Sequence, residues 1–143
     1  MYNICLRMLR NEMDAEDILQ NSFVDVYTNL HTFNYQATPG AWIKRIVINN
    51  CINHLKKRRI NFEEMSNVAD VIDESRITEN YDIDVNKIKS AMNLLSDGYR
   101  TVFSLYALEG YDHAEIAQVL DISESTSKSQ YHRAKQKIKS MLA

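Results

Sequence analysis

Near its C-terminus the chain reads Asp112-His-Ala-Glu-Ile-Ala-Gln-Val-Leu120, then Asp121-Ile-Ser123, then a basic stretch from Glu124 to Lys139. Asp112 and Glu115 have the spacing of a capping box, and Ser123 can cap a following helix in the same way. Asp121 stands in the turn, where Asp tolerates a left-handed backbone better than most residues do. Two capped helices joined by a short turn are therefore predicted, which is the pattern of a helix-turn-helix.

The second of these helices is strongly basic. From residue 126 onward it has five basic side chains and no acidic one. At about 100° per residue, one face is expected to point into the core. That inner face consists of Ser127, Tyr131, Ala134, Ile138 and Leu142. The outer face carries short polar groups and a histidine, which can meet base edges while Lys and Arg hold phosphates.

We therefore predict that this helix enters the major groove of duplex DNA. The alternative is an ordinary solvated basic helix. The predicted DNA contacts are Ser125, Thr126, Lys128, Ser129, His132, Arg133 and Lys135.

Composition narrows the fold class. The chain has 143 residues, 45% of them hydrophobic, with three Gly and one Pro. Apolar residues recur at spacings of three and four, which predicts an all-α protein. No apolar stretch approaches the roughly 20 residues that cross a bilayer, so we expect a cytoplasmic protein without membrane insertion. Cys5 and Cys51 lack the spacing of a metal site or disulfide framework and are interpreted as small core residues.

Charge divides the chain into three segments. Residues 1–60 carry eight basic and five acidic side chains, residues 61–85 one and eight, and residues 86–143 eight and six. The middle segment lacks sustained apolar periodicity, as a solvated linker does. We predict two small helical domains, residues 1–60 and 86–143, joined by an acidic linker at residues 61–85.

The first domain is expected to begin a helix near Asp14, with Asp14 as its cap and Asp17 three residues on. Its apolar stripe comprises Ile18, Leu19, Phe23, Val26, Tyr27, Leu30 and Phe33. Its opposite face is polar, which is typical of simple solvation, and comprises Glu16, Asp17, Gln20, Asn21 and Asp25.

A second helix is expected from Ala41 to about Arg59, after the break at Thr38-Pro-Gly40. Its basic residues are Lys44, Arg45, Lys56, Lys57, Arg58 and Arg59. A basic end can simply favour the helix dipole. Six unopposed charges beside Trp42 and a line of Asn residues indicate instead a nucleic-acid surface. The Asn residues are Asn49, Asn50 and Asn53.

The second domain is expected to begin near Asp84 with a helix through Leu95. A second helix should follow from a Ser96 cap and stop at Gly110, in the position that favours a left-handed glycine. The helix-turn-helix comes next.

Both domains, in this order, resemble the extracytoplasmic-function (ECF) sigma factors of bacterial RNA polymerase, which retain the second and fourth sigma regions. The resemblance covers nearly the whole chain. It is carried by the strings Asp14–Phe23, Trp42–Lys57, Leu95–Phe103, Glu109–Tyr111, Glu115–Ala117 and Thr126–Ala134.

The resemblance implies an alternative sigma factor that binds core RNA polymerase and promoter DNA. It has no catalytic chemistry of its own, no cofactor and no small-molecule substrate, and an anti-sigma factor is expected as a further partner. The helix at Asp14–Phe23 would dock on the β′ clamp. The implied polymerase contacts are Asp14, Glu16, Asp17, Gln20 and Phe23.

The resemblance also implies that an unpaired base of the minus-ten element is held between residues 33–40 and the helix at Trp42. The fourth region would read the minus-thirty-five element. The implied minus-ten contacts are Asn34, Thr38, Trp42, Lys44, Arg45, Asn49, Asn53, Lys56 and Lys57.

Several features depart from the family. The chain enters almost directly at Met1, so the family's first helix is expected to be missing and the stripe around Ile18 to lose part of its cover. Ser96 replaces a common Pro, Asn53 stands where Asp is frequent, and Ser127 replaces an apolar residue.

Two other functions are open to this sequence. A polymerase-independent regulator could bind an operator as a dimer through residues 112–139, but it leaves the strings of the first domain unexplained. A hydrolase could use Asp14, Glu16 and Asp17, but no partnering His, metal-ligand spacing or Gly-rich phosphate loop accompanies them.

Overall fold

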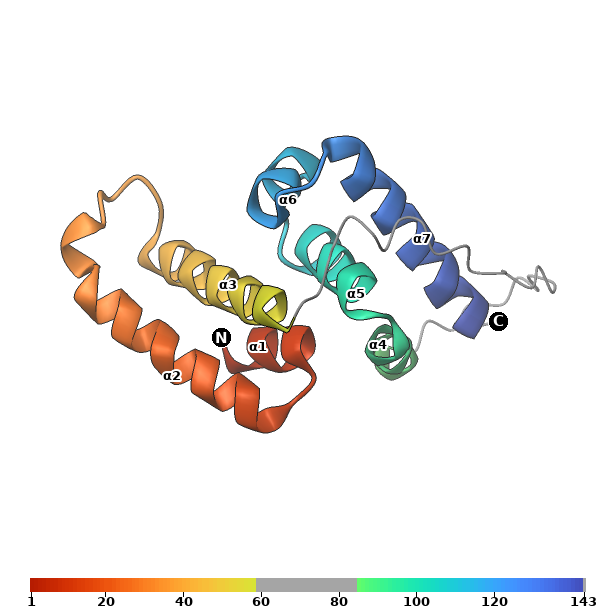
Figure 1. Cartoon of the computed structure of the whole chain (residues 1–143), viewed down its shortest axis with the longest axis horizontal. Coiled ribbons are helices and arrows are strands. Elements are labelled where there is room, and N and C mark those ends of the chain that lie inside the picture. The colour runs from red at the N-terminus through yellow and green to blue at the C-terminus, as the bar shows by residue number, and fades with distance from the viewer. Residues whose placement is uncertain (59–84, 143) are drawn as a thin grey trace. The chain divides into compact units, whose positions relative to one another are not determined.

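The computed structural model describes residues 1–58 and 85–142, which are helical with no strand among them. The all-α prediction is confirmed. The chain divides into two compact units, Met1–Ile60 and Asn61–Ala143. Each is a bundle of short helices (Figure 1). Nearly all of the predicted acidic linker lies outside the described residues.

The first unit consists of α1 (Tyr2–Leu9), α2 (Glu12–Thr28), the single 3₁₀ turn η1 (Leu30–Thr32) and α3 (Pro39–Lys57). Each of the three α-helices packs against the other two. The core is aliphatic and thiol-rich. Its buried side chains are Cys5, Met8, Leu9, Ala15, Val47, Ile48, Cys51, Ile52 and Leu55.

A short helix, α1, precedes α2, and the expectation that the family's longer first helix is missing stays a prediction. Eight residues form a helix that buries one face against α2 and α3. Ile18 on α2 is accordingly half-buried rather than bare. Cys5 on α1 is hydrogen-bonded to Cys51 on α3, and both thiols are free and buried, as small core residues should be.

Helix α2 begins earlier than predicted. Its N-cap is Asn11, whose Oδ1 accepts from the backbone N–H of Asp14 at 3.0 Å, so the prediction of Asp14 as the cap is wrong. The predicted apolar stripe is also wrong in part: Phe23 is 50% and Tyr27 83% exposed. Ser22 lies within about 20° of Ala15 around the helix, whereas Phe23 and Tyr27 lie about 80° and 120° away.

A polar contact replaces apolar packing between α2 and α3. The Nδ2 of Asn50 donates to Ser22 Oγ at 3.0 Å and to Asp25 Oδ2 at 2.8 Å. Asp25 was predicted on the solvated face and Asn50 on a nucleic-acid surface; the structure corrects both. Each side chain is partly buried, and each provides a hydrogen-bond partner for the other. The pairing avoids the free-energy cost of an unpaired buried polar group.

Helix α3 starts at Pro39, two residues before the prediction, because proline suits the first helical position. Thr38 caps it, with Oγ1 accepting from the N–H of Ala41 at 3.2 Å. The last helical residue is Lys57, not Arg59.

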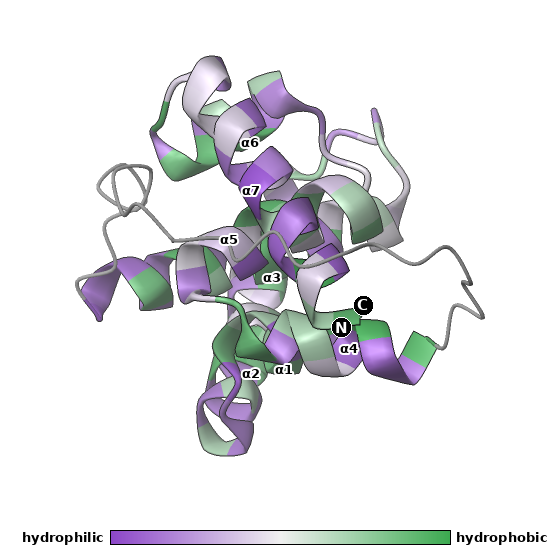
Figure 2. Cartoon of the chain, turned by 90° about the vertical axis from the view of Figure 1, so that its right-hand side faces the viewer, coloured by the Kyte–Doolittle hydropathy of each residue, from purple (hydrophilic) through white to green (hydrophobic). Residues whose placement is uncertain are grey.

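The second unit consists of α4 (Val85–Leu94), α5 (Asp97–Phe103), the π-helical turn η3 (Ser104–Leu108), α6 (His113–Leu120) and α7 (Glu124–Leu142). Figure 2 shows hydrophobic and hydrophilic bands along these helices, as expected of amphipathic elements. One core cluster joins α4 and α5 to α7. Its buried members are Ala91, Met92, Leu95, Tyr99, Ala134 and Ile138.

The junction between α4 and α5 is built on a buried arginine. Ser96 occupies the N-cap position but its side chain makes no capping bond, so the expected Ser96 cap is only positional. Arg100 is fully buried; it donates to the carbonyl of Leu95 at 3.0 Å and pairs with Asp97. Gly110, at φ 75°, follows the end of η3, as predicted for a left-handed glycine.

Candidate nucleic-acid and protein interfaces

The helix-turn-helix forms as its sequence predicts. The Oδ1 of Asp112 accepts from the N–H of Glu115 at 2.7 Å and caps α6. Asp121 adopts the left-handed conformation, at φ 59° and ψ 48°. The Oγ of Ser123 then accepts from the N–H of Thr126 at 3.0 Å and starts α7. These local bonds fix the first turn of α7 against α6.

The faces of α7 also agree with the helical-angle prediction. Ser127, Ala134 and Ile138 are buried, and Tyr131 is half-buried. Sequence analysis missed Gln130, which is fully buried. The outermost predicted contacts are exposed and lie within about 60° of one another around the helix. They are Ser125, Ser129 and His132.

The remaining predicted contacts of α7 flank this strip. Lys128 and Lys135 lie on one side of it, and Thr126 and Arg133 on the other, at about 100° per residue. The Nζ of Lys135 lies 5.2 Å from the ring centre of Tyr131. This cation–π contact holds the lysine charge close to α7. Basic side chains on both sides of a polar strip match a duplex groove, which has phosphates on both sides.

A histidine that the sequence analysis did not single out joins the two helices. The Nδ1 of His113 lies 2.8 Å from the Oγ of Ser127, a hydrogen bond in which either atom can donate. The ring of His113 stacks on Tyr106 at 4.4 Å, and Tyr106 in turn contacts Tyr131 at 4.4 Å. Ser127 therefore has a polar partner at a position where an apolar residue is expected in a generic helix-turn-helix. The unusual Ser at position 127 was the sequence feature that could have indicated this contact.

In the first unit, α3 presents a face made of one aromatic residue, amides and cations. These residues fall within about 80° around the helix, opposite Cys51. They are Trp42, Arg45, Asn49, Asn53 and Lys56. Lys57 lies next to this face, whereas Lys44 lies on the other side of α3 and is half-buried. The structure thus brings together most of the predicted minus-ten residues of α3 and separates Lys44 from them.

Three aromatic rings meet at the start of α3. Phe33 lies 4.8 Å from Tyr35 and 5.2 Å from Trp42, measured between ring centres. Tyr35 is 86% exposed and has a left-handed backbone at φ 61°, an uncommon conformation for a residue with a side chain. Sequence analysis did not name Tyr35, because no periodic pattern marks a turn residue.

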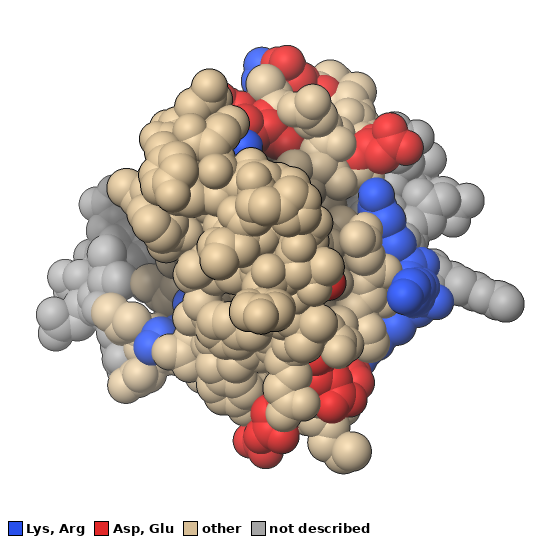
Figure 3. All heavy atoms as spheres, turned by 90° about the vertical axis from the view of Figure 1, so that its left-hand side faces the viewer, with Lys and Arg blue, Asp and Glu red and all other residues tan. Residues whose placement is uncertain are grey.

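The surroundings of these rings are uncharged. Residues 26–43 contain no Asp, Glu, Lys or Arg, and Figure 3 shows a broad uncharged area on the side facing the viewer. The predicted contacts Asn34 and Thr38 lie in this segment. Asn34 Oδ1 accepts from the N–H of Gln36 at 3.2 Å, and Thr38 caps α3, which leaves the Asn34 amide and the Thr38 hydroxyl as donors.

The outer face of α2 combines carboxylates with bare apolar side chains. Glu16, Asp17, Gln20 and Phe23 are exposed, as predicted for polymerase contacts. Three exposed apolar residues on the same face were missed: Met13, Val24 and Tyr27.

Asp14 is placed differently from the other predicted polymerase contacts. Its carboxylate pairs with Arg58 and lies 3.5 Å from Nε2 of His54, both near the end of α3. Asp14 therefore already has partners within the first unit.

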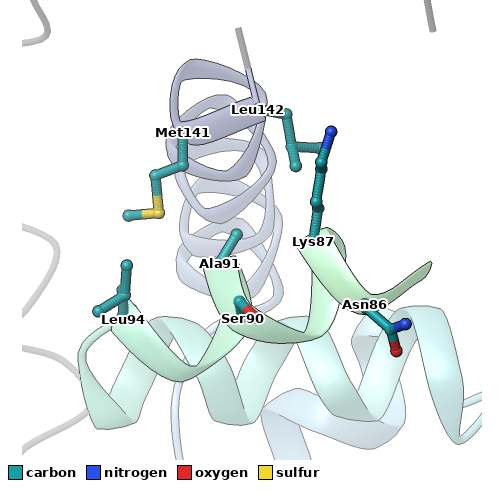
Figure 4. A pocket seen from close by; sticks show the side chains of 7 residues that line it. All are labelled: Asn86, Lys87, Ser90, Ala91, Leu94, Met141 and Leu142. Carbon is teal, nitrogen blue, oxygen red and sulfur yellow. The ribbon is translucent and has the colours of Figure 1, made fainter. Parts of the chain in front are cut away.

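A groove lies at the far end of α7 from the predicted DNA contacts. It has a volume of about 490 Å³ and separates the C-terminal part of α7 from α4 (Figure 4). Leu94 and Met141 face each other across it, with Ala91 at its base. The lining is largely apolar with one lysine, unlike a surface that holds phosphates.

In the described part of the chain, no three His, Cys, Asp or Glu side chains come together in a way that could hold a metal ion. Among residues 1–58 and 85–142, no helix is both long and apolar enough to cross a membrane.

Comparison with known proteins agrees with this geometry. The family model for sigma-70 region 2 matches residues 1–60, and that for sigma-70 region 4 matches residues 86–138. The chain is 27% identical to the ECF RNA polymerase sigma factor SigW of Bacillus subtilis, over 99% of this chain and 82% of the relative. It is 23% identical to SigM of the same organism, over 99% and 87%.

A solved structure shares the fold. It is the sigma factor RpoE in complex with the anti-sigma factor NepR from Bartonella quintana, with a TM-score of 0.65. The two chains are 20% identical, with 99% of this chain and 88% of the other covered.

Regions 2 and 4, in this order, define a sigma factor of bacterial RNA polymerase. Both of the Bacillus subtilis relatives named above are ECF RNA polymerase sigma factors. The chain belongs to the ECF sigma factors, which are alternative sigma factors that direct transcription initiation.

Proposed function

We propose that this sigma factor binds its partners through three separate helical faces. The outer face of α2 binds the clamp of core RNA polymerase. The amide and cationic face of α3, with the rings at its start, binds the melted minus-ten strand. The outward strip of α7 binds the minus-thirty-five duplex. The single observation that carries this proposal is that most residues of each predicted set are exposed, and that most of those on α2, α3 and α7 share one face of their helix.

The face of α2 suits a basic protein partner. Carboxylates at Glu16 and Asp17 can steer association with cations, and the exposed ring of Phe23 can fill a pocket once water is displaced. A rigid helix holds these groups in place before binding, so little ordering entropy is lost.

The rings at the start of α3 suit an unpaired base. Extracting a base from its stack costs a few kcal/mol, and stacking on an aromatic side chain returns about 1–3 kcal/mol. Tyr35 offers an exposed ring for that purpose, with the Asn34 amide and the Thr38 hydroxyl as donors nearby. Arg45 and Lys56 on α3 can hold the phosphates.

In this proposal the chain performs no catalysis, because the polymerase makes the RNA. It acts in the cytoplasm, where polymerase and promoters are found. An anti-sigma factor, as in the Bartonella quintana complex, is a further expected partner. A polymerase-independent operator binder would need only α6 and α7, and would leave the apolar outer face of α2 without a role.

The test is co-purification of the full chain with sigma-free core RNA polymerase. The variant is the double substitution Asp17→Lys and Phe23→Ala. A matched control in the second unit is Glu124→Lys with Leu108→Ala, which also reverses one charge and removes one exposed apolar side chain. We expect a stable complex with the wild type and the control, and loss of the complex with the α2 variant.

Two results would contradict the proposal. Retention of the complex by the α2 variant would remove this face from polymerase binding. Failure of the wild type to bind core, together with tight binding to duplex DNA alone, would favour the dimeric regulator.

A further inference from the structure

The helix-turn-helix contains a polar contact between two side chains, His113 and Ser127, that are not among the proposed DNA contacts. His113 is the first residue of α6, and Ser127 lies in the first turn of α7. Their side chains are 2.8 Å apart, between Nδ1 and Oγ. Ser127 is fully buried and His113 is half-buried, so competing water reaches this bond from the histidine side only.

Two aromatic rings contact the imidazole, one from η3 and one from α7. Tyr106, in the π-helical turn η3, stacks on it with an angle of 16° between the ring planes. Tyr131, one turn along α7 from Ser127, lies edge-on at 5.8 Å. His113 thus contacts η3 and two successive turns of α7. π-Helical turns occur often at functional sites.

The contact lies directly behind the DNA-reading strip. Ser125 and Ser129 are each two residues from Ser127 and point away from it by about 160°, at 100° per residue. Any rotation or shift of the first two turns of α7 that breaks the contact also moves these two side chains. Misplacement of about 1 Å is enough to weaken hydrogen-bond readout.

We propose that His113 is a positioning residue for promoter reading, which holds the start of the recognition helix α7 through Ser127 and so sets affinity for the minus-thirty-five element. This inference rests on the proposed role of α7. The inference assigns a role in promoter reading to His113, which lies in the first helix of the motif and is not one of the proposed DNA contacts.

The protonation state of His113 matters to this contact. Burial lowers the pKa of His113 below its ordinary value, and Lys128 lowers it further, whereas Asp112 and Glu124 act in the opposite direction. The site therefore disfavours the protonated ring, so uptake of a proton weakens the hold of the site on His113. The titratable and charged groups around it are Tyr106, Asp112, Glu124, Lys128 and Tyr131.

The test is a double-mutant cycle in the full chain bound to core RNA polymerase. His113→Phe keeps a ring to stack on Tyr106 and removes Nδ1; Ser127→Ala removes Oγ. The DNA is a promoter fragment whose minus-thirty-five segment has been selected from random sequence by the wild-type holoenzyme. We expect each single variant to lose about two- to tenfold in affinity, the value of one hydrogen bond, and the double variant to lose no more.

A pH profile separates positioning from plain structural support. The ratio of wild-type to H113F affinity should fall as the pH is lowered from about 8 to 5, since only the wild type can take up a proton at residue 113. Taking the ratio cancels the contributions of all side chains that the two proteins share. Circular dichroism at each pH confirms that both proteins are folded at the assay temperature.

Two outcomes overturn the inference alone: losses that multiply in the double variant, or a ratio that does not change with pH. A third outcome concerns the proposed function. If the wild-type holoenzyme binds the selected fragment no better than one with a scrambled minus-thirty-five segment, the role assigned to α7 is wrong, and the inference goes with it.

Discussion

Asp14 and Asp17 are separated by one helical turn and differ in their surroundings. The carboxylate of Asp14 pairs with Arg58 from the end of α3, whereas Asp17 is exposed. The Asp14 side chain is itself 28% and the Arg58 side chain 36% exposed, so the pair is partly screened by water. Such a pair contributes about 0–1 kcal/mol to stability. Asp14 therefore stabilises the first unit, and Asp17 is left for a partner.

This difference gives a paired prediction. Asp14→Asn should lower the free energy of unfolding by up to about 1 kcal/mol and leave affinity for core polymerase nearly unchanged. Asp17→Asn should do the reverse, because its carboxylate has no role in the fold and is proposed to face the clamp. Urea denaturation and a fluorescence titration with core measure the two quantities. Equal loss of core affinity in both variants would show that Asp14 also contacts polymerase.

At the scale of the elements, the turn between α6 and α7 is determined by residues within and directly beside it. Asp112 and Ser123 cap the two helices, and Asp121 supplies the left-handed residue between them. A left-handed backbone costs a residue with a side chain about 1–2 kcal/mol, less for Asp and least for Gly. The turn therefore depends on the identity of residue 121 more than on its packing, because its side chain is exposed.

Asp121→Ala should destabilise the second unit by about 1 kcal/mol, since Ala lacks the tolerance of Asp for this conformation. Asp121→Gly should be nearly neutral: it relieves the backbone but adds chain entropy to the unfolded state. Thermal unfolding followed by circular dichroism compares the two. A glycine variant as unstable as the alanine variant would mean that the Asp121 side chain, not its backbone conformation, supports the turn.

At the scale of the whole molecule, each unit carries one proposed DNA surface of modest size. A short polar strip on α7 and a few rings and cations near α3 give weak sites when separate. Linked sites gain from effective concentration only when geometry allows both to be engaged. In the proposed function, polymerase supplies that geometry, and the acidic segment between the units is too negative to bind DNA itself.

Promoter spacing should therefore decide activity. Inserting about 5 base pairs between the two elements, half a turn of duplex, places the minus-thirty-five groove on the opposite side. Transcription in vitro by the reconstituted holoenzyme should fall at least tenfold. Linking two binding sites can raise the overall affinity by about 100-fold or more, so tenfold is a conservative expectation. A control insertion of the same length upstream of both elements should have no effect. Output that is indifferent to spacing would mean that the two units do not act on one promoter together.

Much of this molecule follows from local sequence. The caps at Asp112 and Ser123, the glycine at 110 and the inner and outer faces of α7 all appear where sequence predicts them. These features depend on contacts within about one helical turn, and such contacts can be read directly from spacing. The helical class and the family could be predicted for the same reason.

The remaining features depend on neighbouring helices. Asn11 rather than Asp14 caps α2, Asn50 turns inward to Asp25, and His113 finds Ser127 fourteen residues away. Spacing cannot foresee these pairings, because they depend on which helix lies opposite and on the cost of leaving a buried polar group unpaired. The sequence by itself determined the helical class, the family, and the caps and faces of the helix-turn-helix. Only the tertiary structure decided which polar side chains pair inside the units and which remain exposed, because that depends on which helix packs against which.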